Sequence, residues 1–189
     1  MTITTLTLDG PHWAFALRFY NRPSVADACL MLQDCAGVDV NVLLMALHAA
    51  CDRGVALSIS DVRDMDEAVL AWRTEVVQAL RAVRRRMKAG PEPAPSEATE
   101  ALRDQIKAAE LGAEQIQQAV LACWLDRHYG EPSPQIVAVG DVVQNVVAYF
   151  AARRGTIRDM ATKSDAQVAM QTLVQAAATL NSTPNETST

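Results

Sequence analysis

The sequence has little of what builds sheets or membrane spans. Aromatic residues make up 5% of its 189 residues, and it has only eight glycines. The longest apolar stretch, residues 42–51, is interrupted by His48 and is too short to cross a bilayer. The N-terminus has neither the basic segment nor the apolar run of a secretion signal. We therefore expect a cytoplasmic protein with no integral membrane segment.

Motifs for metal binding and catalysis are also missing. The four cysteines form no CxxC pair, and no two of the three histidines stand at the spacing of metal ligands on a helix. No GxSxG, Walker A or HExxH pattern occurs. We expect no metal, no cofactor and no catalytic residue, and an enzyme would need a constellation that the order of residues hides. The thiols of Cys29, Cys51 and Cys123, each among apolar residues, are expected to be buried and reduced.

What is present favours helices. Hydrophobic residues reach 50%, alanine is plentiful, and the net charge is -5 with a pI of about 5.2. A negative chain is not drawn to nucleic acid by its charge, so any affinity for anions must be local.

Two long amphipathic helices between residues 66 and 129 organise the chain. They are separated by three prolines in residues 90–96, which cannot continue a helix. Apolar residues recur at helical spacing on both sides of this break. On the first helix they are Val69, Trp72, Val76, Leu80, Val83 and Met87, and on the second Leu102, Ile106, Ala109, Ala113, Ile116, Val120 and Trp124. The pattern predicts an antiparallel helical hairpin.

Each helix of the hairpin carries charged residues about 100° round from its apolar side, in the same sense. Counted from the turn, residues whose numbers sum to about 186 should lie opposite one another. This register predicts a structural ion network of Arg73 with Glu110 and Glu114. It also predicts a cluster of four cations as a tentative site for a phosphate or carboxylate, formed by Arg81, Arg84, Arg103 and Lys107. The alternative is a solvated basic surface, or structural ion pairs that include Asp104.

Caps and breaks divide the remaining chain. We expect a leader over residues 1–10, an all-α bundle over 11–130, a two-helix extension over 131–180 and a disordered tail over 181–189. Asp39 is placed to cap a nearly all-apolar helix over 40–53, Ser24 and Asp27 resemble a capping box, and Ser60 with Asp61 can cap a further helix. Helices over 135–153 and 164–180 complete the extension, which packs either on its own domain or on a partner.

Several other polar residues are candidates for a site. His48 and Cys51 could form a nucleophile pair, but no third group orients them, and a core histidine is the ordinary explanation. His12 and His128 stand at helix ends. Asp34, Asp39 and Asn41 offer oxygen ligands near a turn, yet their spacing is not that of a calcium loop, and capping explains them.

A family resemblance rests on residues in four stretches. These are Trp13, Phe15, Tyr20, Pro23, Val25, Ala28, Cys29, Leu30, Leu32, Gln33 and Asp34; Gly37 to Asn41 with Leu43 and Leu44; Trp72, Arg73, Val76, Val77, Leu80 and Arg81; and Leu102, Arg103, Ile106, Lys107, Glu110, Leu111 and Glu114. In these residues the chain resembles DUF2390, a family of uncharacterised proteobacterial proteins, over residues 11–129. The resemblance implies a small helical protein without an assigned activity, with residues 131–189 as an extension.

Two functions follow as expectations. The favoured one is a non-catalytic cytoplasmic interaction or adaptor protein, which binds a protein partner or itself through the alanine-rich extension and the charged side of the hairpin. The alternative is a small-molecule site, enzymatic or sensory, that holds an anion at the four cations. A weaker third idea is membrane-surface association through the basic residues between Arg73 and Lys88.

Overall fold

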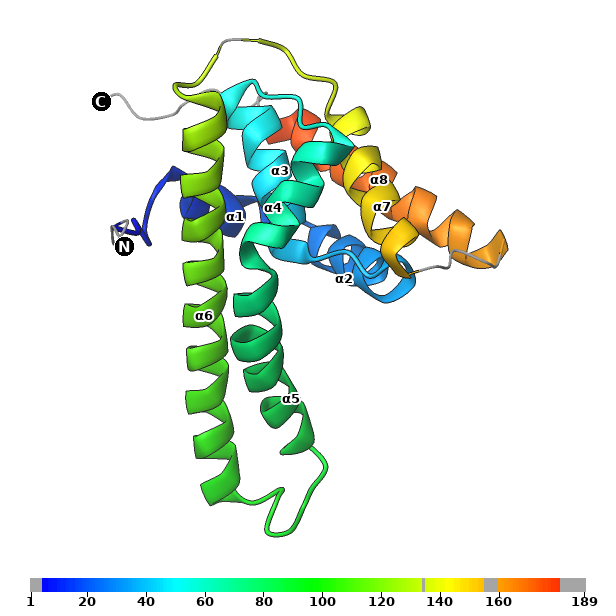
Figure 1. The fold of residues 1–189 in the computed structure, drawn as a ribbon. Coiled ribbons are helices and arrows are strands. Elements are labelled where there is room, and N and C mark those ends of the chain that lie inside the picture. The colour runs from blue at the N-terminus through cyan, green and yellow to red at the C-terminus, as the bar shows by residue number, and fades with distance from the viewer. Residues whose placement is uncertain (1–4, 134, 155–159, 181–189) are drawn as a thin grey trace, which may run out of the picture.

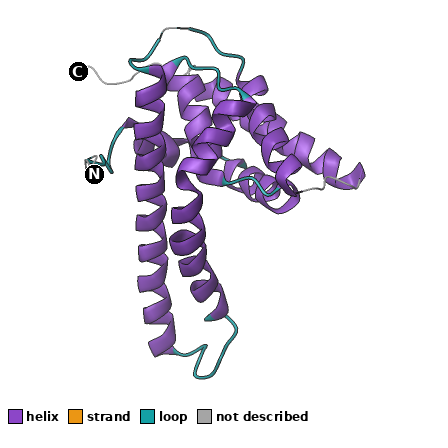
Figure 2. Cartoon of the chain, in the orientation of Figure 1, coloured by secondary structure: helices purple, strands orange, loops and turns teal. Residues whose placement is uncertain are grey.

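The computed structural model describes residues 5–133, 135–154 and 160–180, so the expected tail at 181–189 and the start of the leader lie outside the described residues. The protein is all-α, as its composition predicted, and no strand occurs in the three described ranges (Figures 1 and 2). The helices form a body from which a pair of helices projects.

Three short helices begin the body: α1 (Pro11–Tyr20), α2 (Val25–Ala36) and α3 (Val40–Arg53). Asp39 caps α3 as predicted, because its Oδ1 accepts a hydrogen bond of 2.9 Å from the amide of Val42. The capping box at Ser24 is wrong, since Ser24 has a φ of 64° and makes no side-chain cap bond. Most of α3 is buried, in line with its apolar sequence.

A continuous rod follows, made of α4 (Ile59–Trp72), the π-helical turn η1 (Arg73–Val77) and α5 (Gln78–Arg86). Ser58, not Ser60, caps this rod, because Ser58 and Asp61 form a reciprocal capping box. The π turn has more residues per turn than an α turn, so each residue rotates less about the axis and the following side chains face a different side of the rod.

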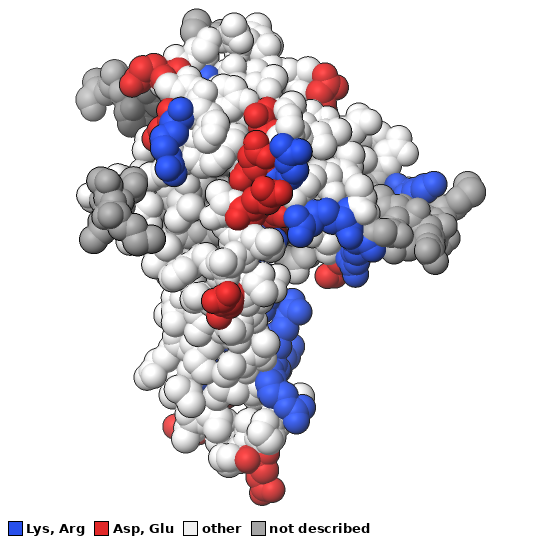
Figure 3. Space-filling view, in the orientation of Figure 1, with Lys and Arg blue, Asp and Glu red and all other residues white. Residues whose placement is uncertain are grey.

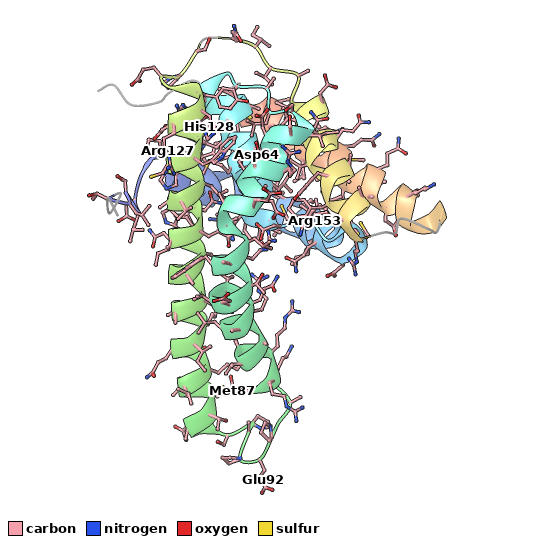
Figure 4. All side chains as sticks on the ribbon, viewed as in Figure 1. Asp64, Met87, Glu92, Arg127, His128 and Arg153 are labelled. Atoms are coloured by element: carbon pink, nitrogen blue, oxygen red, sulfur yellow. The ribbon has the colours of Figure 1, made fainter. Side chains whose placement is uncertain are left out.

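The longest helix, α6 (Glu97–Tyr129), returns along the rod after the proline turn. Its N-terminal half and α5 form the projecting pair, which we call the arm and define as residues 78–110 (Figure 1). Met87 and Glu92 lie toward its far end in Figure 4. No residue of α5 is buried, and the buried residues of α6 begin at Glu110, so the arm stands outside the core.

The C-terminal helices α7 (Val139–Arg154) and α8 (Met160–Leu180) pack on the body. Helix α7 contacts α3 and α4, and α8 contacts α2 and α7. Val146, Phe150 and Leu173 belong to the same hydrophobic cluster as the apolar side chains of α3. The extension therefore packs on its own chain, and much of the apolar surface that we expected it to offer a partner is covered.

None of the helices in the described ranges is both long and apolar enough to span a membrane.

Packing of α8 on its own chain can be tested with two substitutions in that helix. Leu173 is fully buried, whereas Val168 is 60% exposed. We expect Leu173→Ala to lower the free energy of unfolding by about 2–5 kcal/mol, because it leaves a cavity, and Val168→Ala to change it by less than about 0.5 kcal/mol. Urea denaturation followed by circular dichroism measures both. Equal, small effects would contradict the packing of α8.

Candidate functional site

A cleft of about 620 Å³ lies where the arm joins the body. Its walls come from α1, α2, the α2–α3 loop, the start of α3, the π turn with α5, the middle of α6 and the end of α7. This volume lies within the range of sites that hold small organic molecules. The cleft is therefore the candidate functional site.

The cleft is basic although the chain as a whole is acidic. Three carboxylates line it, Asp39, Glu110 and Glu114, against six arginines, which are Arg73, Arg81, Arg84, Arg85, Arg153 and Arg154. The whole sequence has a net charge of -5. Figure 3 shows Lys and Arg side chains along the α5 side of the arm, and Figure 4 shows Arg153 at the body beside it. The local excess of positive charge favours anions.

Two arginines of α5 share two carboxylates of α6. Arg81 donates from Nε to Glu110 Oε1 at 2.8 Å and from a terminal nitrogen to Glu114. Arg84 donates to both oxygens of Glu110, with its terminal nitrogen 3.2 Å from Oε1. Glu110 is buried, and both arginine side chains are about one quarter exposed. These charge-assisted hydrogen bonds tie the base of the arm together.

The predicted pairing of Arg73 with these two glutamates is wrong, because Arg81 and Arg84 take that place. Side chains on a helix lean toward its N-terminus. In an antiparallel pair the long side chains of the two helices therefore lean toward each other. Arg81 thus reaches glutamates that lie several residues farther toward the C-terminus of α6 than the residue whose backbone is directly opposite it. Arg73 instead binds Asp66 and Asp39.

The two glutamates have pKa values that move in opposite directions. Burial alone would raise the pKa of Glu110, but hydrogen bonds from Arg84 and Arg81 outweigh it and hold that pKa below its ordinary value. Burial raises the pKa of Glu114, and the nearby carboxylates of Glu110 and Asp39 add to this rise against the attraction of Arg81. Glu114 is thus the more readily protonated of the pair.

Behind the cleft lies a carboxylate that the sequence analysis did not single out. Asp66 is fully buried and accepts hydrogen bonds from Arg73, from the Tyr149 hydroxyl at 2.9 Å and from Arg153 at 3.1 Å. Arg153 also donates to the Tyr149 hydroxyl at 2.8 Å. Asp66 stands beside Met65, on the apolar side of α4. That acidic residue among core positions was the available signal for a buried ion pair.

Asp39 joins the same network from the α2–α3 loop. Besides capping α3, its Oδ1 accepts a hydrogen bond of 3.1 Å from Gln117 of α6, and its Oδ2 lies 3.5 Å from Arg73. Gln118 donates to the backbone oxygen of Asn41 at 3.0 Å. The capping explanation for Asp39 therefore holds, and the same residue also helps to position Arg73 at the cleft.

The four predicted cations do not form one cluster. Arg81 and Arg84 line the cleft, whereas Arg103 and Lys107 do not. Arg103 donates to Glu100 of its own helix at 2.7 Å, and Lys107 is exposed. Whether Arg81 and Arg84 bind an anion stays a prediction.

Asn41, like Asp39, lines the cleft, whereas His12, His48 and Cys51 do not. His48 is buried with its Nδ1 3.2 Å from Asp52 Oδ2, as expected of a core histidine. Burial raises the pKa of Cys51 to about 11, which does not suit a nucleophile. Burial, then the proximity of His48, lowers the pKa of His12. Among the described residues no three His, Cys, Asp or Glu side chains gather as metal ligands.

Apolar side chains form the other wall of the cleft. Trp13, Leu17 and Tyr20 come from α1, Leu30 from α2 and Leu111 from α6. The three leucines are between 44% and 51% exposed, which is high for leucine. The cleft thus sets an exposed apolar surface against arginines.

Removing the charge of Asp66 should destabilise the fold. Asp66→Asn keeps the shape but leaves Arg73, whose side chain is 11% exposed, with a much weaker partner. We expect a loss of about 3 kcal/mol in the free energy of unfolding. The control Asp64→Asn, on the same helix in an exposed pair with Arg63, should change it by less than about 1 kcal/mol. Guanidinium denaturation distinguishes them, and equal effects would contradict a structural role for Asp66.

The effect of Glu110→Gln should depend on pH. The folded-state pKa of Glu110 lies below the ordinary 4.5, so its ionised form stabilises the fold above pH 4.5, and this contribution is lost as the pH falls through the folded value. At pH 7 we expect the variant to lose about 1–3 kcal/mol, because Arg81 and Arg84 lose a charged partner. Thermal melting from pH 3 to 7 should show the gap to the wild-type protein closing at the acid end.

Glu114→Gln is the matched comparison for Glu110→Gln. Because the folded-state pKa of Glu114 is raised, its ionised form opposes folding, and the stability linked to this group increases as the pH falls toward 4.5. Its substitution should therefore destabilise the protein less at pH 7. A larger loss for Glu114→Gln than for Glu110→Gln would contradict the assignment of the two carboxylates.

Comparison with known proteins identifies a family. No curated protein and no solved structure matches the chain. A family model described as "Protein of unknown function (DUF2390)" matches residues 11–121, more than half of the sequence. This range includes the arm and most of the cleft, but not Tyr149 and Arg153 of α7. The chain belongs to the DUF2390 family.

Proposed function

We propose that the cleft binds a small organic anion, a carboxylate or a phosphate that carries an apolar group. The observation that supports this most directly is the combination of six arginines with three carboxylates in one cleft of an acidic protein. Arginine is the residue best suited to partly buried oxyanions, because its planar fork donates two parallel hydrogen bonds.

Donors remain for such an anion after the internal pairs are made. Arg85 is exposed at the cleft and has no ion pair among the described residues. Arg84 uses Nε and one terminal nitrogen on Glu110, so its second terminal nitrogen is left to donate. An anion between these two side chains would need no internal pair to break.

The apolar wall would hold the rest of the ligand. Leu17, Leu30 and Leu111 leave much of their surface in water, and covering apolar surface contributes roughly 25 cal/mol per Å². An anion with an apolar group should therefore bind more tightly than inorganic phosphate. Since Glu110 is held ionised by two arginines, we propose a binding or sensory role rather than catalysis.

A non-catalytic interaction role in the cytoplasm is the second candidate. The observation in its favour is the projecting arm, on which Val83 and Leu102 are each about half exposed. The four cysteines are free thiols, in keeping with a reducing compartment. Membrane-surface association has less support, because Arg73, Arg81 and Arg84 are occupied by carboxylates.

Thermal melting with four small probes tests the anion site. Ligands that bind the folded state raise the melting temperature with concentration. We expect the largest rise with hexyl phosphate, a smaller one with hexanoate or inorganic phosphate, and none with 1-hexanol. Equal rises with hexyl phosphate and 1-hexanol, or no rise with any anion, would overturn the proposal.

Substitution of one arginine locates the site. Arg85→Gln should weaken hexyl phosphate binding by about tenfold, because a charge-assisted hydrogen bond is lost, without changing stability. Lys88→Gln, two residues beyond the end of α5 and not lining the cleft, serves as the control. Titration of tryptophan fluorescence measures both, since Trp13 lies in the cleft wall. The same affinity in both variants would place the anion elsewhere.

A further inference from the structure

The rod of α4, η1 and α5 is divided by charge along its length. Residues 59–77 contain five acidic and two basic residues, whereas residues 78–86 contain four basic and no acidic residues. In Figure 3 acidic side chains gather on the body above the arm, and basic ones along the α5 side of the arm. Among the exposed side chains outside the internal ion pairs, Glu67 and Glu75 lie in the first half of the rod and Arg85 and Arg86 in the second, an order complementary to an antiparallel copy.

One face of this rod has an acidic residue at one end and a basic residue at the other, separated by two alanines. Glu75, Ala79, Ala82 and Arg86 are spaced by four, three and four residues, which places them on one side of a helix, and all four are exposed. Neither Glu75 nor Arg86 has an ion pair among the described residues. We call these four residues the outer face.

The outer face lies away from the cleft. At about 100° per residue it is roughly on the opposite side of α5 from Arg81 and Arg84, which line the cleft. A molecule bound to the outer face would therefore leave the cleft open.

We propose that two copies of the chain associate through the outer face, with the two α5 helices packed antiparallel about a two-fold axis between Ala79 and Ala82. This arrangement places Glu75 of each copy opposite Arg86 of the other, and Ala79 opposite Ala82. The interface is isologous, since the same residues contribute from both sides. The small alanine side chains let the helix backbones approach closely.

The thinness of the arm also favours a second copy. No side chain of α5 is buried, so the apolar residues between α5 and α6 are covered from one side only. Val83 and Leu102 are each about half exposed as a result. Two arms side by side make a four-helix arrangement, the usual way in which helical hairpins bury such surface. An unrelated partner would need to match an acidic and a basic half in the same order, whereas a second copy does so by symmetry.

Charge reversal of the paired residues tests the association. Sedimentation velocity of the full-length wild-type protein should show a dimer at micromolar concentration that weakens as salt is added. Glu75→Arg alone, or Arg86→Glu alone, opposes like charges at two places in the dimer and should raise the dissociation constant roughly ten- to thirtyfold. The double variant restores both pairs and should restore the dimer.

Lys107→Glu is the control, a charge reversal on the arm that lies on α6 and outside the outer face. It should leave the dissociation constant unchanged. Because Glu75 and Arg86 are exposed, melting temperatures of the single variants should stay within a few degrees of the wild-type value when all are measured as monomers. A wild-type protein that stays monomeric, single variants that dimerise as well as wild type, or a double variant no better than the singles would each overturn the proposal.

Discussion

The buried carboxylate of Asp66 and its bond to Arg73 hold the base of the structure together. An ionised group without water must be paired, and here three partners come from two elements: Arg73 from the π turn, and Tyr149 and Arg153 from α7. The network links the rod to the C-terminal helices in the same place where the arm leaves the body. Two members of the network, Arg73 and Arg153, also line the cleft.

The Asp66–Arg73 pair also affects which arginines bind the glutamates of the cleft. Because Arg73 is bound by Asp66 and Asp39, the two glutamates of α6 are left for Arg81 and Arg84. In this pairing the buried Glu110 accepts hydrogen bonds from both arginines, and some N–H donors of the two guanidinium groups remain unused. The cleft is thus basic because its arginines outnumber the carboxylates that pair with them, and not because consecutive cations cluster along one helix.

The C-terminal helices are part of the core, although they lie beyond the residues that the family model matches. Tyr149 and Arg153 complete the network around Asp66, and Arg153 lines the cleft. Glu114 adds a chemical feature to the same site, since its raised pKa places a readily protonated group beside Arg81. The cleft therefore combines residues from α1, α2, α3, the π turn, α5, α6 and α7.

Local signals in the sequence determined the all-α class and most helix ends. Asp39, Gly37 and Gly54 mark the ends of helices because capping and left-handed turns depend on a few adjacent residues. The ion pairs of the hairpin could not be predicted in this way. They depend on the direction in which long side chains lean, on the π turn and on Asp66, whose partners Tyr149 and Arg153 lie more than 80 residues away. Only the tertiary structure could bring those charges together, since pairing between distant charges is set by packing and not by spacing along the chain.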